Sequence, residues 1–507
     1  MALNNITFVK GKGGLGRPLA GKDYISGLVF YTATLPSGFS STNRYNQIFS
    51  TADAQALGIK GDYNDETQST GIYSITTIGA TGDKITLNFT EPEGVVKVLG
   101  SYVKTATETT NATVASALSL NINAQTYLHG YSASATGGTI IITVRKGLGV
   151  FPNTGTPLTS VVSGTIAGSV TTAFSGGIAS LQSVWYYHIA EFFRIQPKGF
   201  LWLSFQAIPS TYSYSDVQTF QEFTGGEMRQ IGIFKDSAAY TAADTTAIQA
   251  ICNLLDVEKM PISVVFAPNI AAVANVSTLA DLAIYNNNKV SVVIGQDAGG
   301  LGNDIWHATG KSVTTLGATL GTIALSSVQQ NIAWVGKFDL SNGTELESIA
   351  FANGVKFTDV SVTTTLLDAI DLKRYIFLRK FPNKAGSFFN DSHTAITPSS
   401  DYAFIENNRV IDKAIRGVET SLLPSLNSPL LLNANGTLAN STVAYLESEA
   451  IIITNQMVRD GEASAISVTI DPSQNAGSTS EIVVAINIVL IGVARNIIVN
   501  IGFNTSL

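Results

Sequence analysis

The residues from Gly16 to Lys22 have the spacing of a phosphate-binding loop, with two glycines and a lysine at the required positions. Such a loop would surround nucleotide phosphates with backbone N–H groups. Asp23, however, stands where a Ser or Thr would bind magnesium, and its carboxylate would repel a phosphate. No strand is predicted before the loop, and a strand rather than a helix is predicted after it. We therefore expect a glycine-rich arm and no nucleotide or other cofactor.

The histidines lie in four separate regions and form no His-Glu-x-x-His pattern; they are His129, His188, His307 and His393. Asp304 and His307 share one turn-rich segment beside Trp306. This pair could hold a metal ion, although a polar contact within a loop is the simpler expectation. The Gly-x-Ser-x-Gly pattern of a nucleophile elbow is absent. The sequence therefore predicts no catalytic residue, no metal site and no enzyme.

A pair of carboxylates that cleaves glycosidic bonds leaves no sequence motif, because the two acids meet only in the fold. Grooves that cleave sugars are usually rich in tryptophan, and this chain has only four, at positions 185, 202, 306 and 334. A hydrolase of cell-surface polysaccharides therefore stays open as the weaker alternative.

Composition points to a large protein with a weakly charged surface. The chain has 507 residues, enough for three or four domains, and only 13% of them are charged, about half the usual share. Such a surface is typical of protein packed against other protein. The net charge of −7 argues against direct nucleic-acid binding. The single cysteine, Cys252, excludes an intrachain disulfide, and we expect it to be a buried apolar side chain.

Neither the N-terminus nor the apolar C-terminal segment has the pattern of a targeting or membrane signal. The N-terminus lacks the basic and apolar regions of a signal peptide. The Ile/Val-rich segment from Ile482 to Phe503 contains Arg495 and three asparagines, whereas a spanning helix needs about 20 mostly apolar residues. We expect two strands joined near Gly492 and no membrane span.

Changes in composition divide the chain into six parts. Between Ser101 and Ser180 only four residues are charged, which sets a low-charge module apart from the rest. The expected parts are an N-terminal arm (1–22), the first part of a core domain (23–73), the low-charge α+β module (74–180), an α/β middle domain (181–362), a C-terminal domain (363–490) and a C-terminal arm (491–507).

Hydrophobic periodicity predicts a mixed α+β and α/β multidomain fold, with a mixed-sheet core built from the middle and C-terminal regions and a β-rich α+β module added to it. Strands are expected at residues 24–31, 83–89, 139–144, 188–193, 199–205, 230–234, 262–267 and 290–294. Helices are expected at residues 51–57, 110–123, 215–223, 241–257, 277–286, 312–328, 404–423 and 442–460.

A basic run without acids follows the middle domain, at Lys373, Arg374, Arg379, Lys380 and Lys384. Charges of this kind often protect a solvated strand edge from unwanted pairing. They could equally form an electrostatic docking surface for an acidic partner. The sequence leaves both interpretations open.

The order of short motifs in the C-terminal part resembles the C-terminal domain of contractile tail sheath proteins of bacteriophages and related injection machines. The motifs are Leu-Arg-Lys-Phe at 378–381, Gly-Ser-Phe-Phe-Asn-Asp at 386–391, the segment 401–416, Asn-Gly-Thr at 435–437, Gly-Glu at 461–462, Ile-Asp-Pro-Ser-Gln at 470–474 and the segment 495–503. The arm at 13–17, the segment 23–27 and Leu-Gly-Ala-Thr-Leu-Gly at 316–321 also fit this family.

The resemblance implies a structural subunit without catalysis. Sheath subunits stack as rings around an inner tail tube, between a baseplate and a tail terminator protein, and their contraction drives the tube through the target envelope. The chain would then be a homo-oligomer in a virion tail or phage-tail-like particle, assembled in the bacterial cytoplasm. The alternative within the same class is another self-assembling virion protein, such as a non-contractile tail tube or baseplate component.

The resemblance also implies which residues make contacts between subunits. Both arms would add strands to sheets of neighbouring subunits, using Ile6, Thr7, Phe8 and Val9 at the N-terminus and Ile497, Ile498, Val499, Asn500 and Ile501 at the C-terminus. Arg409, Lys413 and Arg416, on the helix expected at 404–423, are the expected tube-facing charges.

Overall fold

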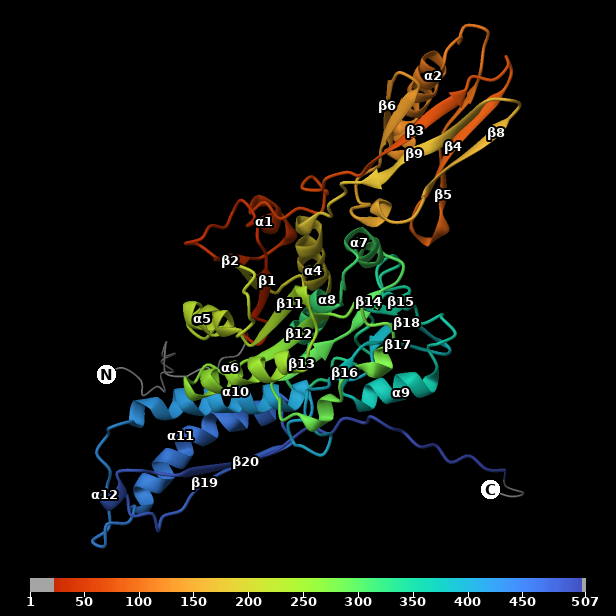
Figure 1. Ribbon diagram of the computed structural model, residues 1–507. Coiled ribbons are helices and arrows are strands. Elements are labelled where there is room, and N and C mark those ends of the chain that lie inside the picture. The colour runs from red at the N-terminus through yellow and green to blue at the C-terminus, as the bar shows by residue number, and fades with distance from the viewer. Residues whose placement is uncertain (1–21, 504–507) are drawn as a thin grey trace, which may run out of the picture.

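The computed structural model describes residues 22–503, and it places them in three layers or lobes (Figure 1). A central sheet with helices on both faces forms the middle. A β-rich module stands at one end of it, and a layer of two long helices with a β-hairpin lies along the other side. The expected mixed α+β, multidomain architecture is confirmed.

The central sheet has seven strands in the order β16-β13-β12-β11-β1-β10-β2. All neighbours are parallel except β10 and the edge strand β2. The inner strands are buried on both faces, as the continuous apolar runs in the sequence predict. The bounds are β1 (Ser26–Tyr31), β2 (Tyr45–Ile48), β10 (Leu201–Gln206), β11 (Gln230–Ala239), β12 (Ser263–Asn269), β13 (Val290–Val293) and β16 (Tyr375–Ile376).

Helices cover both faces of this sheet and close two apolar cores. One face packs against α1 (Thr51–Ala56), α4 (Leu181–Ile195), α7 (Leu301–Thr309) and α8 (Leu316–Leu325). The other packs against α5 (Ser215–Phe223), α6 (Ala243–Val257) and α9 (Thr364–Leu372). Cys252 is buried in the second core, as expected.

Two predicted elements are wrong. Residues 188–193, predicted as a strand, belong to helix α4, which begins after Ser180; the Ser180 hydroxyl accepts a hydrogen bond from the Ser183 N–H and caps the helix. Residues 277–286, predicted as one helix, form two short 3₁₀ turns, η3 (Val276–Thr278) and η4 (Leu282–Ile284). The Asp281 side chain bonds the N–H of Ala283, which starts a new turn and interrupts a continuous helix.

The β-rich module has a core of its own and contains two antiparallel sheets and one long helix, α2 (Asn111–Ala124). The first sheet has the order β6-β7-β3-β9, with β3 (Thr70–Thr77), β6 (Ser132–Thr136), β7 (Thr139–Thr143) and β9 (Ala167–Ser175). The second has the order β5-β4-β8, with β4 (Lys84–Thr90), β5 (Val96–Val103) and β8 (Leu158–Ser163). Short helices at η1 (Pro92–Gly94), α3 (Thr126–His129) and η2 (Phe151–Asn153) complete it.

Two small two-stranded sheets lie outside the central sheet, in the part of the chain between β13 and α10 (Ile405–Leu422). One joins β14 (Gly295–Asp297) to β15 (Ile349–Phe351), and the other joins β17 (Leu378–Phe381) to β18 (Lys384–Phe389). Both pairs are antiparallel.

The C-terminal layer consists of α10 (Ile405–Leu422) and α11 (Asn440–Arg459), with a hairpin of β19 (Ala465–Ile470) and β20 (Val484–Val489) packed on them (Figure 1). The short helices η5 (Leu423–Ser425) and α12 (Ala476–Thr479) lie in its connections. No helix within residues 22–503 is both long enough and apolar enough to cross a bilayer.

The prediction of two strands joined near Gly492 is also partly wrong. The first is β20, but its partner is β19, which precedes it in the chain. Every second side chain of β20 packs against the helices, and β19 supplies the matching register, so the hairpin is complete without the residues after Gly492. Residues 493–503 leave the layer in an extended conformation (Figure 1).

Candidate assembly interface

The C-terminal segment from Asn496 to Phe503 is uncovered. The predicted inter-subunit residues Ile497, Ile498 and Ile501 are 76%, 78% and 91% exposed, and Val499 and Phe503 are also exposed. The segment is extended, and within the described chain it has no strand partner. It also carries no charge after Arg495. A contiguous run of exposed branched apolar side chains is typical of a surface that another protein covers.

The hairpin of β19 and β20 is a second feature suited to strand exchange. It is a two-stranded sheet, and in the range 22–503 neither outer edge is paired. One face is packed on α10 and α11, which holds the strands in place. Unpaired edges present rows of backbone N–H and C=O groups that can accept a further strand.

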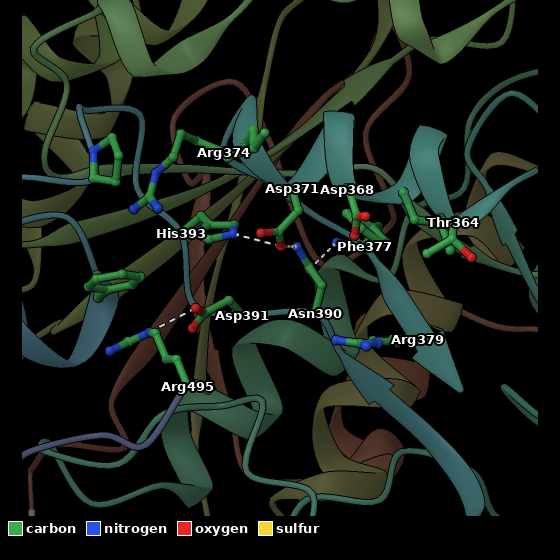
Figure 2. A pocket seen from close by; sticks show the side chains of 14 residues that line it. Thr364, Asp368, Asp371, Arg374, Phe377, Arg379, Asn390, Asp391, His393 and Arg495 are labelled. Atoms are coloured by element: carbon green, nitrogen blue, oxygen red, sulfur yellow. Dashed lines mark hydrogen bonds and ion pairs between the residues drawn. The ribbon is translucent and has the colours of Figure 1, made fainter. Parts of the chain in front are cut away.

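The arm is fixed to the body of its own chain at Arg495. Its guanidinium donates hydrogen bonds to Asp391 (2.8 Å; Figure 2) and to Glu406 (2.5 Å), and it lies 3.4 Å from the centre of the Phe404 ring. Glu406 is 2% exposed. Burial raises the pKa of the Glu406 carboxyl, whereas the charge of Arg495 opposes that rise. Arg495 therefore compensates a buried negative charge.

Arg495 borders a cavity of about 360 Å³ between α9 and the loop before α10. In this cavity His393 Nε2 lies 3.0 Å from Asp371 Oδ1, and Asn390 donates to the same carboxylate (Figure 2). The Arg374 guanidinium donates to the carbonyl oxygens of Thr394 and Ala403. These contacts hold the loop against α9. Across residues 22–503, no group of three His, Cys, Asp or Glu side chains is arranged to bind a metal ion.

Asp304 and His307 do not form a loop contact, because both lie on helix α7. The His307 ring instead contacts a carboxylate of the module, with 2.8 Å between Nε2 and Glu93 Oε1. His188, on α4, packs its ring against Phe30 and Phe234 of the central sheet, and neither ring nitrogen is hydrogen-bonded among the described atoms. Burial lowers the pKa of the His188 ring to about 3.

Of the three expected tube-facing charges, Arg409 and Arg416 are buried and Lys413 is only partly exposed, which contradicts the expectation that they form an exposed charged face. Arg409 is 5% exposed and donates to the hydroxyl and the carbonyl oxygen of Ser326, and burial lowers its pKa to about 10. Lys413 Nζ contacts the carboxylates of Asp23 (2.8 Å) and Glu462 (2.5 Å). Arg416 is 9% exposed. The helix was correctly predicted, but its charged side faces the protein, because the N-terminal segment and the connection to β19 pack on it.

The basic run is also partly internal. Lys373 donates to the carbonyl oxygens of Ser277 (2.6 Å) and Leu279 (2.7 Å), and Arg374 is 3% exposed. Arg379 and Lys384 are exposed on the β17–β18 hairpin. A docking role therefore stays a prediction for this hairpin only.

The other expected contacts between subunits, Ile6, Thr7, Phe8 and Val9, lie outside the described residues, as does the glycine-rich arm up to position 21. Sequence reasoning missed the partners Asp23, Asp391, Glu406 and Glu462. The only available signal was Arg495 itself, a single charge in an apolar tail.

Residues 3–393 match the family model described as DUF2586, N-terminal domain, and residues 401–507 match the model described as DUF2586, C-terminal domain. No curated protein matches the sequence.

Solved structures similar to the chain include the anti-feeding prophage (AFP) helical sheath in its contracted state, with 13% identity, coverage of 63% of this chain and 81% of that chain, and a TM-score of 0.45. The contracted PVC sheath complex of an extracellular contractile injection system has 14% identity, coverage of 63% and 80%, and a TM-score of 0.43. The six-fold symmetrised AFP baseplate has 13% identity, coverage of 63% and 80%, and a TM-score of 0.40.

Proposed function

The chain belongs to the DUF2586 family, and from its uncovered C-terminal segment and its sequence motifs we propose that it is the structural subunit of a contractile tail sheath. In this role it polymerises around an inner tail tube and contracts to drive the tube through the envelope of a target cell. No catalytic step is required. The particle is a phage tail or a phage-tail-like injection machine assembled in the bacterial cytoplasm.

The observation that carries the proposal is the exposed apolar run from Ile497 to Phe503. Burial of branched apolar side chains contributes about 1.5–3 kcal/mol for each side chain that becomes fully covered. Backbone pairing to a sheet edge adds hydrogen bonds and fixes the register. The segment is therefore suited to pairing with a neighbouring subunit, as the resemblance to sheath proteins implies.

The exposed segment from Ile497 to Phe503 and the edges of the β19–β20 hairpin, which are unpaired within residues 22–503, are different surfaces of the same chain. A contact that joins two different surfaces is head-to-tail, and it generates rings or open helical polymers rather than closed dimers. Extended linkers allow subunits to rotate as rigid bodies without breaking the strand pairing. Stacked rings around a tube, bounded by baseplate and terminator proteins, are the proposed assembly.

Electron microscopy of the protein co-expressed with its inner tube protein tests this function. We expect the full chain to form striated hollow tubes, and a chain lacking residues 491–507 to remain as dispersed subunits. The double variant Val499→Pro and Ile501→Pro should act like the truncation, because proline removes two backbone donors. The control Val360→Ser changes an exposed apolar residue outside the arm and should still form tubes. Regular tubes from the truncated chain would refute the proposed role of the arm, and dispersed full-length protein would refute the sheath function.

A further inference from the structure

Two carboxylates meet at the N-terminus of helix α7. Glu345 Oε2 accepts a hydrogen bond from the Leu301 N–H (3.0 Å), and Asp297 Oδ1 accepts one from the Gly299 N–H (3.1 Å). A Cβ atom added to Gly300 would lie 2.4 Å from Asp297 Oδ2 and 2.6 Å from Glu345 Oε2. The two acidic groups therefore converge on one small volume.

Asp297 is fully buried, and its Oδ2 atom has no hydrogen-bond partner among the described residues. Two ionised carboxylates that both border the space beside Gly300 would repel each other strongly in a buried site. Either a proton or a cation between them would remove that repulsion. Burial and the neighbouring Asp297 raise the pKa of the Glu345 carboxyl from its usual range to about 7.

The surroundings favour a proton over a cation. The N-terminus of α7 carries a partial positive charge, which stabilises one negative charge and disfavours a cation. A third acid, His or Cys that could complete a metal site is absent from the part of the chain that the structure describes. The other charged or titratable groups nearby are the ion pair of Glu191 and Arg194 on α4 (2.6 Å), the Tyr187 hydroxyl on α4, and Asp304 on α7 itself.

Helix α7 also carries the contacts that hold the β-rich module. The Val150 N–H donates to the carbonyl oxygen of Ala308 at its C-terminal end (2.8 Å). Glu93 of the module contacts His307 of α7 (2.8 Å) and Lys356 beside it (2.7 Å). The position of α7 therefore affects how firmly the module is attached.

We propose that Asp297 and Glu345 form a proton-binding site, in which one shared proton keeps α7 packed on the central domain and the module attached to it. The proton is carried by the Glu345 carboxyl and donated to Asp297 Oδ2. When the pH rises and the proton leaves, repulsion between the two carboxylates loosens the N-terminal turn of α7. This site goes beyond the proposed assembly function and does not depend on it.

The test is hydrogen–deuterium exchange of the full chain at about pH 6 and about pH 8, read at the amides of Leu301–Asp304. These amides lie at the end of α7 away from the His307–Glu93 contact. Glu345→Gln mimics the protonated acid, because its amide can donate to Asp297. We expect the wild type and this variant to exchange at the same rate at pH 6. At pH 8 the wild type should exchange about tenfold faster than the variant measured at the same pH.

Asp297→Asn removes the same repulsion and should behave like Glu345→Gln, so a folding failure of one variant leaves the other. The matched control Asp401→Asn removes an exposed carboxylate of the loop before α10 and should follow the wild type. Equal exchange of wild type and both variants at pH 8 would overturn the proposal. Slower wild-type exchange at pH 8 on addition of calcium or magnesium chloride would also overturn it, because a cation would then hold the pair.

Discussion

The ammonium group of Lys413 lies 2.8 Å from the carboxylate of Asp23, 390 positions earlier in the chain. The same ammonium also contacts Glu462, at the connection to β19. One lysine on α10 thus joins the beginning of the described chain, the long helices and the hairpin that precedes the C-terminal arm. Lys413, which was expected to face a tube, instead contacts two carboxylates of its own subunit.

Replacing Lys413 with Met should destabilise the protein by about 2 kcal/mol, because two largely buried carboxylates lose their partner. Urea unfolding, followed by circular dichroism, measures the change. Lys384→Met is the matched control, because Lys384 is exposed, and it should leave the midpoint unchanged. Equal midpoints for the two variants would show that the contacts of Lys413 with Asp23 and Glu462 contribute nothing to stability.

Arg495→Ala should destabilise the folded chain by about 2 kcal/mol, because the buried carboxylate of Glu406 loses its cation. Adding Glu406→Gln should recover most of that loss, since a neutral amide can be buried at lower cost. A double-mutant cycle in urea gives the coupling free energy. Arg459→Ala removes an exposed arginine and serves as the control. An additive cycle would contradict the Arg495–Glu406 contact.

Gly317→Ala should disrupt the packing of α8 on α4. A Cβ atom at this position would lie 2.0 Å from the carbonyl oxygen of His188, and backbone cannot move away as a flexible side chain can. We expect a loss of about 3 kcal/mol in the free energy of unfolding. Gly492→Ala, where no atom lies within 4 Å of the added Cβ, is the control and should be neutral. A thermal midpoint that Gly317→Ala leaves unchanged would contradict the close contact.

His188 should make the protein sensitive to acid. Its pKa is about 3 in the folded protein and about 6.5 when unfolded, so the unfolded state binds the proton first as the pH falls. Stability should therefore decrease below pH 6.5, by about 1.4 kcal/mol for each pH unit. His188→Leu should reduce the difference between urea midpoints at pH 7 and pH 5, whereas Val360→Ser, which changes an exposed side chain that does not titrate, should leave that difference unchanged. An unchanged difference in His188→Leu would reject this source of acid sensitivity.

The local pattern of apolar residues was sufficient to predict the type of most helices and strands. The apolar spacing of α10 and α11 and the continuous apolar runs of β12 and β13 predicted their type within a few residues, because each pattern reports which side must be buried. The prediction failed at α4, where a six-residue apolar window was too short to distinguish a strand from a buried helix. It also failed at 277–286, where a side chain of Asp281 competes with the helical hydrogen bonds.

Residue types and their spacing were enough to predict the class of fold, the weakly charged surface, the apolar C-terminal segment and the resemblance of the C-terminal motifs to those of sheath proteins. These depend on residue type and short-range spacing, which can be seen in one dimension. Three results needed the folded chain: Arg409 and Arg416 are buried, Arg495 neutralises Glu406, and Asp297 lies beside Glu345. Each of these results depends on which distant segment packs against a side chain, and the free energy of a charge is set by that neighbour rather than by the helix or strand that carries it.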